Sequence, residues 1–196
     1  MGKKPTADKS EIQNMAGLTL RPERTDDLEF LHRLYASTRA DEMALVDWSP
    51  EEMGLFLQSQ FEAQHSYYLE HYQESRFDVI EQAGVAIGRL YVARWPDDIC
   101  IIDISLLPEH RGRGLGGRML QALLDEAAST GKNVSMNVEI NNPALHLYER
   151  LGFKPKGEDN GIYRMMEWRS GKSGSSGPEK SGKMKAKRRA DNNDLP

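Results

Sequence analysis

Hydrophobic and polar residues recur with two different periods across residues 17–169, which indicates a folded domain built from strands and helices. Strands are expected where short apolar runs end at turn residues, over 18–21, 77–82, 85–95, 99–107, 134–140 and 162–168. Ala83-Gly84 separates two of these runs and predicts a hairpin. Helices are expected where apolar residues recur with helical spacing, from Thr25, from Ser49, from Leu115 and over 143–151. This order predicts an α/β (α+β) fold with a mixed sheet.

Two of the expected helices begin at residues that commonly cap helices. The segment 49–52, SPEE, supplies a serine for the N-cap, a proline for the first turn and a glutamate three residues after the serine. That helix is expected to continue through Gln60 and Gln64. Thr25 is expected to cap the preceding helix, whose apolar stripe is Leu28, Leu31, Leu34 and Tyr35. Both helices are therefore predicted to precede the main group of strands.

Composition divides the chain into three regions. Residues 1–16 are polar and aperiodic and are expected to form a flexible leader to the domain at 17–169. Residues 170–196 are rich in Gly, Ser and Lys, which predicts a disordered basic tail. This tail holds seven Lys/Arg and three Asp/Glu, so the total net charge of −4 leaves about −8 on the rest of the chain. An acidic body disfavours nucleic acid as the main ligand and suits a cationic partner.

The sequence gives little reason to expect a membrane, an oxidising compartment or a metal. No apolar run approaches the roughly 18 residues of a membrane span, and the basic N-terminal residues precede no apolar stretch of the kind found in signal peptides. Cys100 is the single cysteine, which excludes an internal disulfide. We therefore expect a cytoplasmic protein. No metal is expected either, because metal-ligand spacing is absent among His32, His65, His71, His110 and His146.

The glycine-rich segment 108–117, PEHRGRGLGG, is the most informative part of the sequence. It leaves a buried strand and opens a helix. Glycine lets the backbone approach a ligand closely, and the first turn of a helix offers unpaired N–H groups at the positive end of its dipole. Arg111 and Arg113 add charge of the matching sign. The segment therefore predicts a pyrophosphate site, with a tight turn that merely needs glycine as the alternative.

A dinucleotide is one candidate for that pyrophosphate. Gly112, Gly114 and Gly117 satisfy the spacing G-x-G-x-x-G, and Glu139 lies about where that motif has its ribose-binding acid. A dinucleotide fold needs several more strand–helix units, however, and only about 29 residues follow Glu139 before the tail. The residues at 108–111 also lengthen a connection that is nearly direct in dinucleotide folds. The context therefore disfavours this interpretation.

Two motifs resemble those of the GNAT acetyltransferase superfamily. Arg111-x-x-Gly114-x-Gly116 resembles its acetyl-CoA signature, and 141–153, NNPALHLYERLGF, resembles its element N-x-x-A-x-x-L-Y-x-x-x-G-F. The resemblance covers about residues 18–168. It implies a mixed, mostly antiparallel central sheet flanked by helices, the fold of acyl-CoA N-acyltransferases. It also implies an enzyme that transfers the acetyl group of acetyl-CoA to a primary amine.

The resemblance further implies which residues contact acetyl-CoA. The strand before the glycine turn would lie along the pantetheine arm, and an N–H near Leu106 would polarise the thioester carbonyl. The strands that carry Leu106 and Glu139 are expected to separate and admit acetyl-CoA between them. The residues implied to contact acetyl-CoA are Ile104, Ser105, Leu106, Arg111, Gly112, Arg113, Gly114, Leu115, Gly116, Gly117, Asn141 and Tyr148.

Tyr148 matches the family tyrosine that protonates the departing thiolate of CoA. A phenol is protonated at neutral pH, and the thiolate needs a proton as the C–S bond breaks. The alternative is that Tyr148 only packs beside other apolar residues of its helix. The resemblance favours the catalytic role.

The base that deprotonates the amine has three candidates. Glu139 lies two residues before Asn141, near the expected cleft. Asp103 interrupts an apolar strand, and an unexplained buried carboxylate is often functional. Strand alternation, however, points Asp103 to the face opposite Ile104 and Leu106, where it would only pair with a helix residue. Water that relays the proton is the third candidate.

The acceptor is expected to bind to the two helices that precede residue 75, as in the family. The candidate residues are Asp41, Glu42, Trp48, Gln60 and Gln64, although a solvated helix surface would explain them equally well. The acceptor is a small-molecule amine or a protein amine, and either is compatible with a homodimer. Two other functions stay open. One is a catalytically silent CoA-binding regulatory module, which Tyr148 disfavours, and the other is a dinucleotide-dependent oxidoreductase, which the topology disfavours.

Overall fold

The computed structural model describes residues 13–15 and 17–171. The predicted leader up to residue 12, residue 16 and the predicted tail from residue 172 onward lie outside the described residues. The helices are η1 (Thr25–Asp27), α1 (Leu28–Thr38), α2 (Ala40–Met43), α3 (Pro50–His71), η2 (Pro108–His110), α4 (Leu115–Thr130) and α5 (Leu145–Arg150). The strands are β1 (Gln13–Met15), β2 (Leu18–Pro22), β3 (Arg76–Gln82), β4 (Val85–Arg94), β5 (Asp98–Leu106), β6 (Asn133–Glu139), β7 (Lys154–Pro155) and β8 (Tyr163–Trp168).

The strands form one sheet in the order β1-β2-β3-β4-β5-β6-β8-β7. All neighbouring strands are antiparallel except β5 and β6, which are parallel because α4 carries the chain back between them. β1 pairs with β2, so residues 13–15 of the predicted leader belong to the sheet. The predicted mixed, mostly antiparallel sheet with flanking helices is confirmed.

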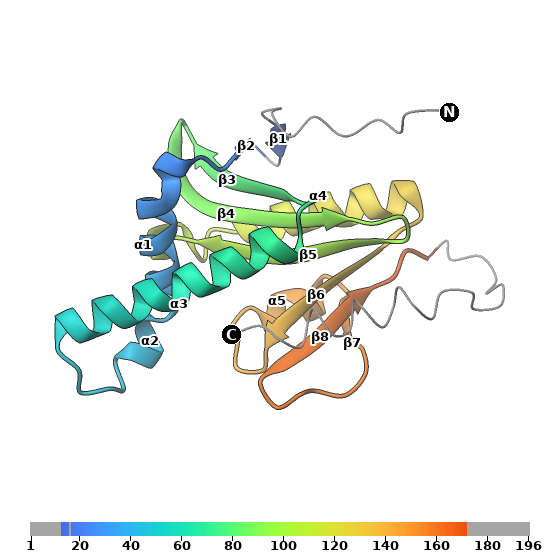
Figure 1. Ribbon diagram of the computed structural model, residues 1–196. Helices are drawn as coiled ribbons and strands as arrows, with labels where there is room; N and C mark the ends of the chain where they lie inside the picture. Colours follow the sequence, from blue (N-terminus) through green and yellow to red (C-terminus); the bar gives the residue numbers. More distant parts are fainter. Residues whose placement is uncertain (1–12, 16, 172–196) are drawn as a thin grey trace.

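Helices cover both faces of the sheet, with α3 in front of the central strands and α4 behind them in the view of Figure 1. Val79 and Ile80 are neighbours on β3, so their side chains point to opposite faces. Val79 packs in a core with residues of α1 and α3, whereas Ile80 packs in the larger core that contains Met119 and Leu123 of α4. The sheet is therefore buried between two helical layers.

β5 and β6 are paired over only part of their length. Their register begins at Asp98↔Asn133 and, within the described residues, ends at Ile101↔Met136. β5 nevertheless continues to Leu106 and β6 to Glu139, and the two strands diverge in Figure 1. The predicted separation of the strands that carry Leu106 and Glu139 is therefore present.

One of the two predicted helix caps is confirmed and the other is wrong. Ser49 Oγ accepts a hydrogen bond from Glu52 N at 3.3 Å, and Glu52 Oε2 accepts one from Ser49 N at 2.8 Å. Thr25, by contrast, lies inside η1 and caps no helix with its side chain. Asp27 holds this start instead, because its carboxylate accepts Arg24 N at 2.7 Å and also binds the Arg21 guanidinium at 2.7 Å.

The elements that the sequence did not predict are the shortest ones: β1, η1, α2, η2 and β7. None is long enough to display a period. The β3–β4 hairpin is confirmed, with Ala83 and Gly84 both at positive φ, as a tight two-residue turn requires. The last helix, predicted over 143–151, is shorter, because Asn142 Oδ1 accepts Ala144 N at 2.8 Å before α5 begins.

Gly88 allows β4 and β5 to approach each other closely. A Cβ at this position would lie 2.3 Å from the Ser105 carbonyl oxygen and 2.7 Å from a Leu106 methyl carbon. Gly88→Ala should therefore lower the free energy of unfolding by about 1–3 kcal/mol, measured by urea denaturation. Gly54→Ala in α3 is the matched control: its Cβ would meet nothing within 4 Å, so it should stabilise the protein by roughly 0.5–1 kcal/mol. Equal stability of the two variants would contradict this packing.

Candidate active site

The turn between β5 and α4 contains the predicted glycines. Gly112 and Gly114 have φ of 69° and 75°, in the left-handed region where other residues are strained. A Cβ built on Gly112, Gly114 or Gly116 would meet nothing within 4 Å. Two of the glycines are therefore required by the backbone conformation, and the three together leave open space above the turn.

The N-terminus of α4 offers hydrogen-bond donors to this space. Gly114 O accepts the first intrahelical bond, from Arg118 N at 3.0 Å, and no side chain caps the helix. Within the described residues, the N–H groups of 115–117 have no hydrogen-bond acceptor. Three N–H groups at the positive end of a helix dipole form a site for an anion such as a phosphate.

The two arginines of the turn differ in their surroundings. Arg111 turns away from the glycines: its Nε donates to Leu106 O at 2.7 Å and its Nη2 to Ser37 Oγ at 2.9 Å. Arg111 therefore ties the end of β5 to α1. Arg113 is exposed and makes no hydrogen bond to another described residue. Of the pair, Arg113 is the one available to a phosphate in this arrangement.

The separated half of β5 presents free backbone groups toward β6. Leu107 N donates to Ile87 O at 2.9 Å, and hydrogen-bonded pairs alternate along an antiparallel ladder. Ser105, opposite Arg89, therefore directs its backbone groups to β4. Ile104 and Leu106 direct theirs to the side where β6 has separated. Arg111 already occupies the Leu106 carbonyl, so the predicted backbone contacts to a ligand fit Ile104 and the Leu106 N–H but not Ser105.

Tyr148 of α5 is buried, at 6% exposure, and its ring packs edge-on against Phe153 with 6.1 Å between centroids. Its hydroxyl makes no hydrogen bond to another described residue. Burial, with a smaller contribution from the negative charge of Asp103, raises the pKa of Tyr148 to about 12. Tyr148 packs in the same core cluster as Leu106, and Ile104 packs against that cluster. Tyr148 is therefore a protonated donor near the place where β5 and β6 part.

Asp103 lies on the opposite face from Ile104 and Leu106, as strand alternation predicts, but its partner is not a helix residue. Arg89 Nη2 of the neighbouring strand donates to Asp103 Oδ2 at 2.6 Å, and Ser105 Oγ donates to Oδ1 at 2.6 Å. Arg89 also donates to Gln64 Oε1 of α3 at 2.8 Å. Both oxygens of Asp103 are therefore already occupied.

Glu139 ends β6 and is more accessible than Asp103, with 34% against 13% of the side chain exposed. Arg39 Nη1 contacts Glu139 Oε1 at 2.8 Å and Glu42 Oε1 at 2.9 Å. Glu139 Oε2 accepts no hydrogen bond from the described residues. Of the two predicted carboxylates, Glu139 thus keeps an oxygen that can receive a proton.

The sequence interpretation missed the two arginines that hold these carboxylates, Arg39 and Arg89. Arg89 is almost fully buried, and it interrupts the apolar run of β4 just as Asp103 interrupts β5. That paired interruption was the available signal. Arg39 left no comparable signal, because it follows α1 on a surface where charged residues are common.

A cluster of Glu23, His65 and Tyr91 adjoins Arg89 on the face of the sheet that α3 covers. Tyr91 donates to Glu23, and His65 Nε2 lies 3.6 Å from the same carboxylate. Burial raises the pKa of Glu23, whereas burial and the charge of Arg89 lower the pKa of His65. Arg89 lies 5.1 Å from the centroid of the Tyr91 ring. No motif connects these residues, since they come from three distant segments of the chain.

The predicted acceptor residues do not form one pocket. Asp41, Glu42 and Trp48 are exposed around α2, and Gln60 is half-buried on α3. Gln64 faces the sheet and is occupied by Arg89. The structure therefore brings Glu42 close to Glu139 through Arg39, and it places Gln64 in a separate, buried network.

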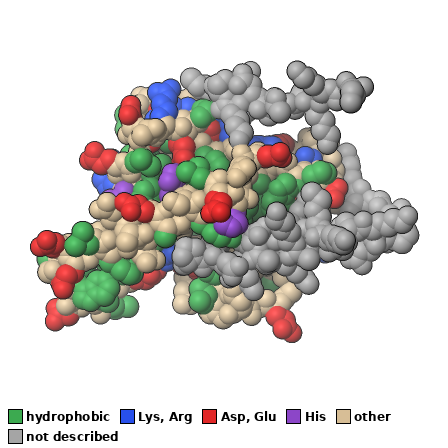
Figure 2. Space-filling view, viewed as in Figure 1, with side chains coloured by type: hydrophobic (Ala, Val, Ile, Leu, Met, Phe, Trp, Pro, Cys, Tyr) green, Lys and Arg blue, Asp and Glu red, His purple; other side chains and the backbone are tan. Residues whose placement is uncertain are grey.

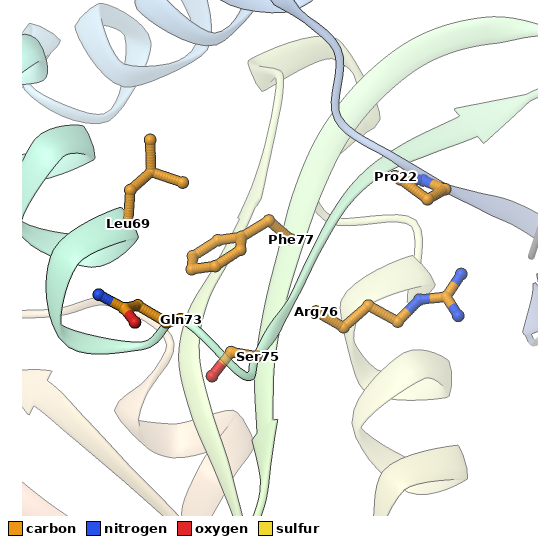
Figure 3. A pocket seen from close by; sticks show the side chains of 6 residues that line it. All are labelled: Pro22, Leu69, Gln73, Ser75, Arg76 and Phe77. Atoms are coloured by element: carbon orange, nitrogen blue, oxygen red, sulfur yellow. The ribbon is translucent and has the colours of Figure 1, made fainter. Parts of the chain in front are cut away.

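A hollow of about 300 Å³ lies elsewhere, lined by Pro22, Leu69, Gln73, Ser75, Arg76 and Phe77 (Figure 3). It contains none of the motif residues. Among the described residues, no group of His, Cys, Asp or Glu side chains is arranged to hold a metal ion. No helix of the described chain is both long and apolar enough to span a membrane.

The sequence matches the acetyltransferase (GNAT) family over residues 31–153, more than half of the chain. This span contains the separated strands, the glycine turn and Tyr148. The chain therefore belongs to the acetyltransferase (GNAT) family. The membership expected from the two motifs, and with it the acyltransferase class of enzyme, is confirmed.

Individual relatives agree with this assignment. A streptothricin acetyltransferase of Streptomyces lavendulae is 35% identical over 72 residues, which cover 36% of this chain and only 38% of that protein. A putative [ribosomal protein bS18]-alanine N-acetyltransferase of Bacillus subtilis (strain 168) is 26% identical over 170 residues, 82% of this chain and 95% of that protein. The PaiA N-acetyltransferase of Thermoplasma acidophilum, solved in complex with coenzyme A, shares the fold with a TM-score of 0.58 and 17% identity, covering 78% of this chain and 98% of that one.

Proposed function

We propose that the chain is an N-acetyltransferase that transfers the acetyl group of acetyl-CoA to a primary amine, with Tyr148 as general acid. The observation that carries this proposal is the arrangement around the separated end of β5. The free backbone groups of Ile104, the free N–H of Leu106, the open N-terminus of α4 and the protonated Tyr148 hydroxyl all adjoin it. The backbone groups and the helix N-terminus suit the binding of an elongated thioester with a pyrophosphate, and the tyrosine hydroxyl suits the chemical step.

The residues present fit acetyl-CoA. The N–H groups of 115–117 would hold the pyrophosphate, and Gly112, Gly114 and Gly116 would leave room for it because no side chain projects there. The free groups of Ile104 would hydrogen-bond the pantetheine amides, as an added strand would. Asn141, exposed after β6, is a further contact in this proposal.

The chemistry that acetyl-CoA supplies is an acetyl group activated as a thioester. The Leu106 N–H, free on the separated side of β5, would stabilise negative charge on the thioester oxygen. As the amine nitrogen bonds to the carbonyl carbon and the C–S bond breaks, Tyr148 would donate its proton to the sulfur. The amine loses one proton in the same overall reaction, so the products are an amide and free CoA.

Glu139 is the residue that we propose to receive the amine's proton. Its Oε2 is unoccupied by the described residues, whereas Arg89 and Ser105 occupy both oxygens of Asp103. Asp103 is then a structural partner of Arg89 that also adds to the protonation of Tyr148. A water molecule between the amine and Glu139 would serve the same purpose.

The two competing interpretations explain less of the structure. A dinucleotide oxidoreductase of the doubly wound kind requires a largely parallel sheet, and among the described strands only β5 and β6 are parallel. A silent CoA-binding module would not need a buried, protonated tyrosine whose hydroxyl has no hydrogen-bond partner among the described residues.

The test is release of free thiol from acetyl-CoA in the presence of a panel of amines. The panel holds polyamines, amino acids, aminoglycoside-type amines and peptides with free N-termini or lysines. We expect thiol release that depends on at least one amine class and on the enzyme. Acetyl-CoA binding by calorimetry without thiol release for any class would favour the silent module instead.

A further inference from the structure

The corner between α2 and α3 exposes four large apolar side chains, which we call the corner patch: Leu45, Trp48, Leu55 and Phe56. Their exposed fractions are 87%, 42%, 64% and 36% in that order. The Trp48 and Phe56 rings meet edge-on with 5.1 Å between centroids, so they form a shared surface. Clustered apolar exposure of this kind marks an interaction site more often than isolated exposed residues do.

Acidic residues dominate the segment that carries the corner patch. Residues 40–75 contain eight Asp/Glu and no Lys or Arg. The chain holds 30 acidic and 26 basic residues, so outside this segment the basic residues outnumber the acidic ones. Figure 2 shows hydrophobic side chains among acidic ones at the end of the molecule where Figure 1 places α2. The acidic residues nearest in sequence, all exposed, are Asp41, Glu42, Asp47, Glu51 and Glu52.

The corner patch is connected to the candidate active site. Arg39, directly before α2, bridges Glu42 at 2.9 Å and Glu139 at 2.8 Å. Arg111 links the end of β5 to Ser37 in the last turn of α1. A ligand that lies on the corner patch and follows α2 would therefore reach the end of β6, where we place the proton acceptor.

We propose that the corner patch docks a basic, amphipathic polypeptide segment that carries the acceptor amine. This deepens the proposed function, on which it rests, by naming a protein amine as the substrate class. Lys and Arg residues of the segment complement the acidic surroundings, and its apolar residues cover the four exposed side chains. A small polyamine would satisfy the charge but leave the apolar side chains in water.

Direct binding tests this proposal without requiring catalysis. Fluorescence anisotropy with dye-labelled peptides compares a Lys/Leu peptide, a Lys/Ser peptide of equal charge and a Glu/Leu peptide of equal apolar content. The Lys/Leu peptide should bind most tightly, the Lys/Ser peptide roughly tenfold more weakly, and the Glu/Leu peptide not measurably. The affinity of the Lys/Leu peptide should also fall as the salt concentration increases, because the acidic residues of the protein are exposed.

Variants assign the binding to the corner patch. Leu45→Ser combined with Leu55→Ser should weaken Lys/Leu binding about tenfold, as should Asp47→Lys combined with Glu51→Lys. Val85→Ser is the matched apolar control, since Val85 is 63% exposed at the β3–β4 hairpin. Glu158→Lys is the charge control. Unchanged melting temperatures establish that each variant is folded.

Binding that is equal in the corner variants and their controls would overturn the proposal. So would a concentration-dependent dimer in sedimentation velocity that the leucine variant abolishes, because the corner patch would then join two copies of this chain. Thiol release with small amines, combined with peptide binding that the corner variants do not weaken, would support the acetyltransferase proposal and refute the docking surface. Corner-dependent peptide binding without thiol release for any amine class would support a docking surface, but it would refute both the transferase proposal and the acceptor role of the docked segment.

Discussion

Gly114→Val is expected to abolish detectable binding of acetyl-CoA while the protein stays folded. Gly114 has a φ of 75°, and a Cβ there would project into the open space above the turn. A β-branched residue is strained at this φ and would also displace the N–H groups of 115–117 from a phosphate. Hydrogen bonds to a charged group contribute about 1.5–3 kcal/mol each, so losing two of them should raise Kd by about a hundredfold or more.

The matched control is Gly131→Val at the other end of α4. Gly131 has a φ of 69° and equally open surroundings, but it follows the C-terminus of the helix. Both variants should lose about 1–3 kcal/mol of stability through backbone strain. Calorimetric titration with acetyl-CoA should then show loss of binding for Gly114→Val only. Wild-type affinity for acetyl-CoA in a folded Gly114→Val protein would refute the proposal that this turn binds the pyrophosphate.

The fold was predictable where the sequence displays a period over several turns or alternations. Ser49 and the apolar positions of α4 located their helices because capping and packing act within the same helix. Thr25 failed as a cap because Asp27 holds the start of this helix: the Asp27 carboxylate accepts Arg24 N and binds the guanidinium of Arg21, which belongs to β2. Local propensity could not show that contact. Short elements such as α2 could not be predicted for a related reason, because contacts with other parts of the fold determine where they form.

The candidate site was predictable in its motifs and not in its charges. The glycine turn and Tyr148 lie in contiguous motifs, so their residues could be found one after another. The roles of Asp103 and Glu139 depend on the arginines that pair with them. Arg89 pairs with Asp103 and Arg39 with Glu139, and both arginines come from segments outside the motifs. Pairing along β4 and β5 brings Arg89 to Asp103, and only the register of that pairing reveals it.

Tyr148→Phe is expected to lower kcat by roughly 10²–10⁴-fold with little change in folding or in acetyl-CoA affinity. The phenylalanine ring keeps the edge contact with Phe153, and the lost hydroxyl has no hydrogen-bond partner among the described residues. Tyr68→Phe is the matched control, since Tyr68 is similarly buried but packs in the core on the α3 side. It should leave kcat within about twofold of wild type. Single-turnover measurements ensure that the chemical step is compared.

The pH dependence of kcat separates proton donation by Tyr148 from a packing role. A general acid must be protonated, so its activity is present below its pKa and is lost as pH rises through it. Because the pKa of Tyr148 is raised to about 12, wild-type kcat should show no decrease from neutral pH to about pH 10, provided that circular dichroism shows intact folding. A decrease in kcat centred well below that range, or a Phe variant with wild-type kcat in single turnover, would refute Tyr148 as the donor. Family membership and the acetyl-CoA site would stand in either case, since neither depends on the hydroxyl.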